Sequence, residues 1–127
     1  MTELTCLELS VILWLAHVLA QLFTARSEFG DDYLFTPRDG KVSPKGLAVG
    51  RATRALHNYV ENLVPFVAMD LGLIATQHTG GIGATIWIIA RIIYLPIYMM
   101  GIKYVRTACW AVGVVGLLMM LGRLAGY

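Results

Sequence analysis

The chain has 127 residues, of which 57% are hydrophobic and only 14% are charged, and its mean hydropathy is +0.67. This composition is far more apolar than a soluble domain needs for one core, so it indicates a membrane protein. The net charge of +2 is small, and the basic residues do not gather into one soluble face. A nucleic-acid partner is therefore not expected.

Four apolar stretches lie near residues 4–25, 52–77, 82–102 and 106–125. At about 1.5 Å of rise per residue, each is long enough to cross a hydrocarbon layer of roughly 30 Å. The segment 26–50 is the only long connection and is rich in glycine, proline and charge. The sequence therefore predicts an all-α integral membrane protein, with one domain over residues 1–127 folded as an antiparallel four-helix transmembrane bundle.

Basic residues indicate how this bundle is oriented, because lysine and arginine concentrate in cytoplasmic loops. They cluster around the first loop and the third connection, at Arg26, Arg38, Lys41, Lys45, Arg51, Arg54, Lys103 and Arg106. We therefore expect the 26–50 and 103–106 loops to be cytoplasmic. Both termini and the 77–81 turn then lie on the opposite side.

Polar side chains form one stripe along each of two predicted helices. On the second helix, an arc of about 80° contains Arg51, Arg54, Asn58, Glu61 and Pro65. On the third helix, an arc of about 60° contains Arg91, Tyr94 and Tyr98.

Glu61 and Arg91 are predicted to lie at similar depth near the middle of the membrane, on neighbouring antiparallel helices. An ionisable group there is costly unless it has a partner. We therefore predict a contact between Glu61 and Arg91, within one chain or across a subunit boundary. A purely structural reading also stays open, in which the pair fixes helix register, Asn58 hydrogen-bonds to it and the tyrosines pack.

The arginines at the mouth, with amides and hydroxyls deeper in, suit a small anion that bears several carboxylates. Arginine binds a carboxylate through two parallel hydrogen bonds and stays charged when partly desolvated. A cationic site also favours the thiolate form of a bound thiol. The pattern thus fits an anionic, peptide-like thiol.

The remaining polar and aromatic residues have simpler interpretations. His17 and His57 have no partner at metal-ligand spacing, so no metal site is expected. Asp70 is predicted to be interfacial and solvated. Small faces for close helix packing are expected at Gly113, Gly116, Gly122 and Gly126. Membrane anchoring or lipid-facing packing is expected for Trp14, Trp87 and Trp110.

These motifs resemble the MAPEG family, the membrane-associated proteins in eicosanoid and glutathione metabolism. The family's R-x-x-R-A-x-x-N-x-x-E pattern with a following proline is matched by Arg51, Arg54, Ala55, Asn58, Glu61 and Pro65. Its R-x-x-[HY]-x-x-x-Y pattern is matched by Arg91, Tyr94 and Tyr98. "TARSEF" is similar to the family's Ala-Arg-x-x-Phe, with Arg26 as the basic residue. "ENLVPF" is closest to the microsomal glutathione transferase branch, and the chain looks most like its bacterial members.

The resemblance implies a homotrimer in a membrane, here expected to be a bacterial inner membrane, with glutathione bound between subunits near the cytoplasmic face. Glutathione is then the cosubstrate, and Arg106 is the catalytic residue that stabilises its thiolate. The spacing from Tyr98 to Arg106 is one residue longer than in the leukotriene synthase pattern. The predicted glutathione-binding set is Arg26, Arg51, Arg54, Asn58, Glu61, Arg91, Tyr94 and Tyr98.

Taken together, the motifs favour a membrane-bound glutathione-dependent transferase or peroxidase, with a role in detoxification. Its thiolate would attack a lipophilic electrophile or hydroperoxide, and its partners would be membrane lipids, the lipophilic substrate and its own copies. The alternative is a non-catalytic lipid-binding or scaffold protein of the same family.

Overall fold

The computed structural model describes residues 1–37, 39–40 and 46–127. Three basic residues used above for orientation, Arg38, Lys41 and Lys45, lie outside the described residues, as does that part of the predicted 26–50 loop. Within the described residues, all regular structure is helical. The predicted all-α class is confirmed.

The elements in chain order are α1 (Glu3–Phe29), α2 (Asp31–Leu34), α3 (Leu47–Ala75), α4 (Gly83–Met100) and α5 (Lys103–Leu124). The first connection is shorter than predicted, because α1 continues four residues past 25 and α3 begins five residues before 52. Gly30, at φ 79°, ends α1 in a conformation that other residues rarely adopt. The four-residue α2 is too short for a periodic sequence signal.

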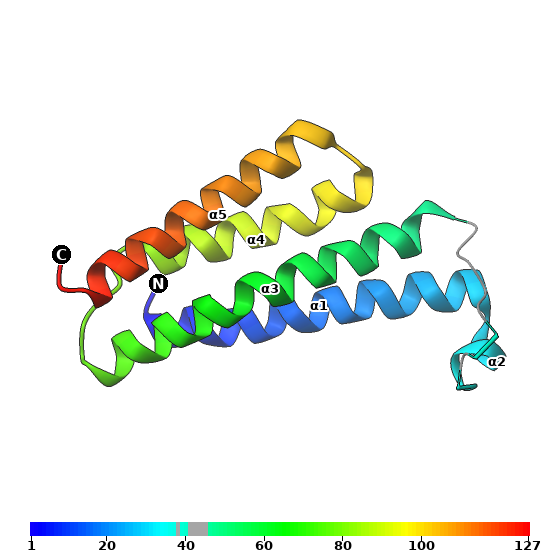
Figure 1. Cartoon of the computed structure of the whole chain (residues 1–127), viewed down its shortest axis with the longest axis horizontal. Coiled ribbons are helices and arrows are strands. Elements are labelled where there is room, and N and C mark those ends of the chain that lie inside the picture. Colours follow the sequence, from blue (N-terminus) through cyan, green and yellow to red (C-terminus); the bar gives the residue numbers. More distant parts are fainter. Residues whose placement is uncertain (38, 41–45) are drawn as a thin grey trace.

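The four long helices run antiparallel in two pairs (Figure 1). α1 lies beside α3, and α5 lies beside α4, with the second pair above the first in this view. Both termini and the α3–α4 turn are at one end, whereas the α4–α5 turn and the start of α3 are toward the other. The fold therefore brings the basic first and third connections to the same end of the molecule, as the alternating path requires.

Among the described residues, three helices are long and apolar enough to cross a membrane by length and composition: α1, α4 and α5. Many large apolar side chains on them are exposed, among them Val11, Ile12, Ile89, Val115 and Leu118. A soluble monomer rarely exposes so much contiguous apolar surface, so these faces are suited to lipid or to neighbouring subunits.

Trp87 is at the centre of the core. It is fully buried and stacks on Phe66, with ring centroids 4.0 Å apart. The prediction that Trp87 anchors the protein or faces lipid is therefore wrong, because α4 contacts α1, α3 and α5 and turns this face inward. Trp14 and Trp110 are both 41% exposed. Trp14 is on the outside as predicted, whereas Trp110 also lines a cavity described below.

Asp70 is also fully buried, and the prediction of a solvated position is wrong. It lies five residues before the end of α3, where the start of α1 and the α3–α4 turn close over this end of the bundle. Glu3 at the start of α1 accepts a hydrogen bond from the Gly80 backbone N–H at 2.6 Å. Within the described residues, neither carboxylate oxygen of Asp70 has a hydrogen-bond partner.

Glycine sets the separation of α4 and α5. A Cβ atom at Gly116 would lie 2.7 Å from the Gly83 carbonyl oxygen and 3.0 Å from the Trp87 nitrogen, so the two helices require glycine there. Gly113 is buried as well. At Gly122 and Gly126, an added Cβ atom would have no described neighbour within 4 Å, so their predicted packing role is not seen within one chain.

We expect Gly116→Ala to lower the free energy of unfolding by about 1–3 kcal/mol, because the added methyl group forces α4 and α5 apart. The matched control is Gly122→Ala, which gains the same helix propensity without a clash. Thermal unfolding of the detergent-solubilised protein measures both. Equal melting temperatures for the two variants would contradict the assigned packing.

Candidate functional site

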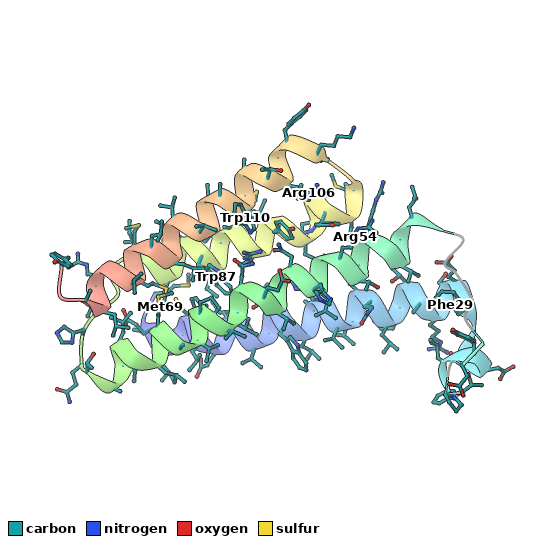
Figure 2. The ribbon with its side chains drawn as sticks, viewed as in Figure 1. Phe29, Arg54, Met69, Trp87, Arg106 and Trp110 are labelled. Atoms are coloured by element: carbon teal, nitrogen blue, oxygen red, sulfur yellow. The ribbon has the colours of Figure 1, made fainter. Side chains whose placement is uncertain are left out.

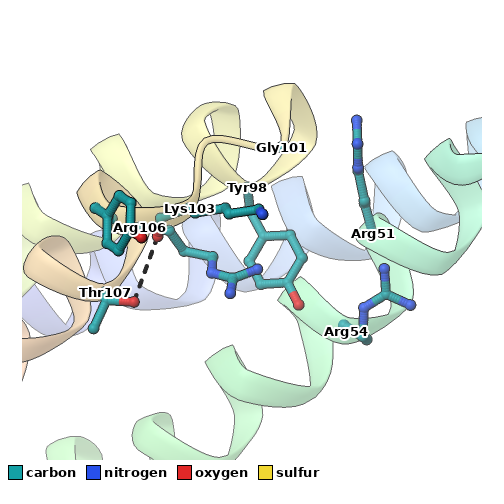
Figure 3. A pocket seen from close by; sticks show the side chains of 8 residues that line it. Arg51, Arg54, Tyr98, Gly101, Lys103, Arg106 and Thr107 are labelled. Atoms are coloured by element: carbon teal, nitrogen blue, oxygen red, sulfur yellow. Dashed lines mark hydrogen bonds between the residues drawn. The ribbon is translucent and has the colours of Figure 1, made fainter.

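A cavity of about 370 Å³ opens between α3 and the α4–α5 hairpin, at the end that carries the basic connections. Arg51 and Arg54 of α3 lie on one side, opposite Tyr98 of α4 and Arg106 of α5 (Figure 3). No acidic side chain is among its described lining residues, which are Arg51, Arg54, Tyr98, Gly101, Lys103, Tyr104, Arg106 and Thr107. We call this cavity the cationic pocket.

The turn between α4 and α5 shapes the mouth of the cationic pocket. Gly101 ends α4 in the left-handed region (φ 74°, ψ 23°), and the Ile102 N–H donates back to the Ile97 carbonyl at 3.3 Å. The guanidinium of Arg51 lies against this turn and donates to the Met99 carbonyl at 3.1 Å. The positive φ of Gly101 favours glycine in this turn, and a Cβ atom there would lie 2.6 Å from Arg51 Nη2, so the guanidinium would have to move.

Arg106 is held over an aromatic face. Its guanidinium carbon is 4.7 Å from the centre of the Tyr98 ring, and Tyr98 in turn packs against Tyr94, with ring centroids 5.5 Å apart. A cation over an aromatic ring is stabilised by the ring's quadrupole. The head of Arg106 is thereby fixed on the pocket side of α5 (Figure 2).

A smaller cavity of about 140 Å³ adjoins the cationic pocket and shares Arg106 and Thr107 with it. Asn58, Tyr94 and Trp110 complete its lining. Asn58 lies one helical turn beyond Arg54 on the same face of α3. The two cavities are therefore adjacent, and together they reach from the basic mouth to the amide of Asn58. We call the smaller one the inner cavity.

Arg91 lies behind the inner cavity and is only 1% exposed. Its Nη1 donates to Asn58 Oδ1 at 2.7 Å, and its guanidinium carbon is 5.5 Å from the Trp87 ring centre and 5.2 Å from that of Tyr94. Its Nε and Nη2 have no partner among the described residues. The guanidinium is thus held by one strong hydrogen bond and two aromatic faces.

The predicted contact between Glu61 and Arg91 is wrong within one chain. Glu61 is exposed and, among the described residues, forms no ion pair with Arg91. Asn58, one turn earlier on α3, takes that partner position, because a depth estimate from residue counts cannot resolve one turn of about 5.4 Å. A contact across a subunit boundary stays a prediction, although Arg91 is already covered by its own chain.

Arg26 is not part of the cationic pocket of its own chain. It forms an ion pair with Asp31 at 2.8 Å at the junction of α1 and α2, where its side chain is 61% exposed. The other predicted residues do come together: Arg51, Arg54, Tyr98 and Arg106 line the cationic pocket, Asn58 and Tyr94 line the inner cavity, and Arg91 holds Asn58.

Five lining residues are outside the predicted set: Gly101, Lys103, Tyr104, Thr107 and Trp110. Lys103 was used only to orient the chain, although a lysine three residues before Arg106 on one helix face is a sign that both serve one pocket. Trp110 follows Arg106 by four residues, so it lies on the same face of the helix. Both positions could have been found from helical spacing.

The chemistry of the lining is that of an anion site. Four side chains are cationic, and the amide and hydroxyl groups can donate hydrogen bonds. Among the described residues, no group of three His, Cys, Asp or Glu side chains could hold a metal ion. The arrangement can therefore bind a polyanion and stabilise negative charge that develops near Arg106.

Fold, composition and site together define an all-helical integral membrane protein with a cationic pocket at one end of its bundle. The MAPEG family model matches residues 5–126, nearly the whole chain, and the chain belongs to this family. The family includes glutathione transferases and related proteins. Comparisons with curated proteins and with solved structures gave no match.

Removing the Asn58 amide is expected to destabilise the fold, because it leaves the buried Arg91 guanidinium with no hydrogen-bond partner. We expect Asn58→Leu to cost about 3–5 kcal/mol, the range for breaking a buried charged contact. His57→Leu, at the neighbouring position, is the control and should be close to neutral. Chemical or thermal unfolding in detergent measures both, and an Asn58→Leu protein as stable as the control would show that Arg91 does not need this bond.

Proposed function

We propose that this protein is a membrane-bound glutathione-dependent transferase or peroxidase. The observation that carries the proposal is the cationic pocket, where Arg51, Arg54, Lys103 and Arg106 converge and none of the described lining residues is acidic. Glutathione has two carboxylates, one ammonium group and a thiol, so its thiolate form has a net charge of about −2. An arginine guanidinium binds a carboxylate through two parallel hydrogen bonds, and the positive charge left over in the pocket favours the thiolate form of the bound thiol.

Arg106 is the proposed thiolate-stabilising residue. It belongs to both cavities, and its position over Tyr98 limits where its guanidinium can move. A fixed cation lowers the energy of a nearby thiolate without reorganising at the moment of reaction. Arg51 and Arg54 then bind carboxylate, and Tyr94 and Tyr98 form the aromatic wall.

The proposed reaction joins this thiolate to a lipophilic substrate that enters from the bilayer. In transfer, the sulfur forms a bond to an electrophilic carbon, and a leaving group departs with the bonding electron pair or a conjugated double bond takes it up. In peroxidase action, two glutathione molecules are oxidised to the disulfide while one hydroperoxide is reduced to alcohol and water. Holding the thiolate beside the substrate supplies the gain from proximity.

The proposed assembly is a homotrimer of four-helix transmembrane bundles. In it α3 is the fourth spanning helix, the 26–50 and 103–106 loops are cytoplasmic and both termini are on the other side of a bacterial inner membrane. Arg26 and Glu61, which lie outside the cationic pocket of their own chain, could then reach glutathione in a neighbouring subunit. This gives a role to both residues that one chain alone does not.

We expect Arg106→Gln to abolish the ultraviolet absorbance signal of bound glutathione thiolate and to lower kcat about a hundredfold, because the side chain loses its charge but stays polar. Stopped-flow mixing of detergent-solubilised protein with glutathione measures the signal. Arg123→Gln, at the far end of α5, is the control with the same change of charge. Full thiolate formation in Arg106→Gln would remove Arg106 from the proposed role.

The molar mass of the detergent-solubilised protein tests the proposed trimer. Multi-angle light scattering, corrected for detergent, is expected to give three copies of the 14.0 kDa chain. Exposed apolar side chains on three spanning helices are the physical reason for association. A monomer or dimer in several mild detergents would contradict the proposed assembly.

One observation favours the alternative of a non-catalytic lipid-binding protein. An apolar groove of about 300 Å³ runs between α4 and α5 on their outer side, lined by Ile86, Ile89, Ala90, Ile93, Ala108, Cys109 and Val112. Such a groove suits a lipid chain held as cargo, which a non-catalytic lipid-binding protein requires. Thiolate formation distinguishes the two functions, because lipid binding alone does not require it.

A further inference from the structure

The orientation of the Asn58 side-chain amide is determined by its neighbour. Arg91 Nη1 lies 2.7 Å from Asn58 Oδ1. A guanidinium has only hydrogen-bond donors, so the amide atom that faces it must be the oxygen. The nitrogen and its two hydrogens therefore point away from Arg91.

Those hydrogens are free to bind a ligand. Asn58 lines the inner cavity, and its Nδ2 makes no hydrogen bond within the described part of the chain. The side-chain nitrogen of Asn62 donates only to the Asn58 backbone carbonyl, so it does not compete for the amide. The Asn58 amide thus presents donors, and not its acceptor, to the inner cavity.

We propose that Arg91 is a positioning residue that locks Asn58 as a hydrogen-bond donor for an anionic or carbonyl oxygen of the ligand beside Arg106. The ligand group that meets Asn58 is then an acceptor, such as a carboxylate. Arg91 itself touches no ligand, because it is 1% exposed and does not line either cavity. This inference rests on the proposed function for the identity of the ligand. The orientation of the Asn58 amide does not depend on the proposed function.

Arg91 is suited to this role because its own position is restricted. The rings of Trp87 and Tyr94 lie 5.5 and 5.2 Å from its guanidinium carbon. On the side of α5, Gly113 leaves room for Nε and Nη2, since a Cβ atom there would lie 3.7 Å from each. Without Arg91, no hydrogen bond among the described residues holds the amide oxygen, and the oxygen could turn toward the anion and repel it.

A double-mutant cycle on the full chain tests the proposal. Glutathione binding is measured by calorimetry for the wild type, Asn58→Ala, Arg91→Met and the double variant. We expect each single change to weaken binding about ten- to a hundredfold, as for a hydrogen bond to a charged group, and the double variant to be no weaker than either. Losses that multiply would show that Arg91 does not act through Asn58, and would overturn the proposal.

Two further variants keep the test valid if Arg91→Met does not fold. Asn58→Asp keeps a partner for Arg91 but removes both donors, so it should retain its melting temperature and lose affinity; wild-type affinity would overturn the proposal. Arg91→Lys keeps a donor and should recover part of the affinity. In turnover, KM should rise while kcat at saturation is retained, because Arg106 is unchanged.

Inorganic phosphate separates this inference from the proposed function. If the wild type binds no glutathione, the proposed function fails, and the same cycle is run with phosphate as the acceptor. Phosphate affinity that depends equally on Asn58 and Arg91 would support the positioning role. Phosphate affinity that is unchanged in both variants, or no phosphate binding at all, would overturn it.

Discussion

The buried guanidinium of Arg91 is the constraint on which the rest of this structure depends. A charge that is removed from water needs partners, and here they come from two helices: an amide oxygen of α3 and two aromatic faces of α4, with a glycine of α5 leaving room. The contacts that stabilise the Arg91 guanidinium therefore fix how α3, α4 and α5 are positioned along one another. That arrangement also puts Arg54 and Arg106 at the same end of the bundle (Figure 2).

The site and the core are continuous as a result. Tyr98 supports Arg106, Tyr94 supports both Tyr98 and Arg91, and Arg91 packs on Trp87 at the centre of the core. Each contact is modest, on the order of 0.5–2 kcal/mol for a cation over a ring. Their effect is chiefly geometric, because they connect the pocket to the buried core around Trp87. The polar stripe on α3 thus serves stability and recognition with the same residues.

Local periodicity predicted the two polar stripes well, because the angular spacing of residues on a helix does not depend on the rest of the fold. It could not identify the partner of Arg91: Asn58 and Glu61 share a face of α3 and differ by one turn, which only packing decides. Trp87 and Asp70 were misjudged for the same reason, since burial near the end of a membrane helix depends on which helices surround it. The motif also misplaced Arg26, whose guanidinium forms an ion pair with Asp31, five residues later, and does not line the cationic pocket. The motifs predicted the MAPEG family, and the match over residues 5–126 confirms it.

The excess of positive charge around the cationic pocket has a practical consequence for handling this protein. Four cations, with no acidic side chain among the lining residues that the structure describes, will attract inorganic anions whenever the organic ligand is absent. Phosphate or sulfate in a purification buffer will then occupy the same arginines and compete with substrate, while added chloride weakens all of these contacts by screening. Affinities measured in different buffers will differ even if the protein is identical, and a preparation in a large organic buffer anion will come closest to its intrinsic affinity.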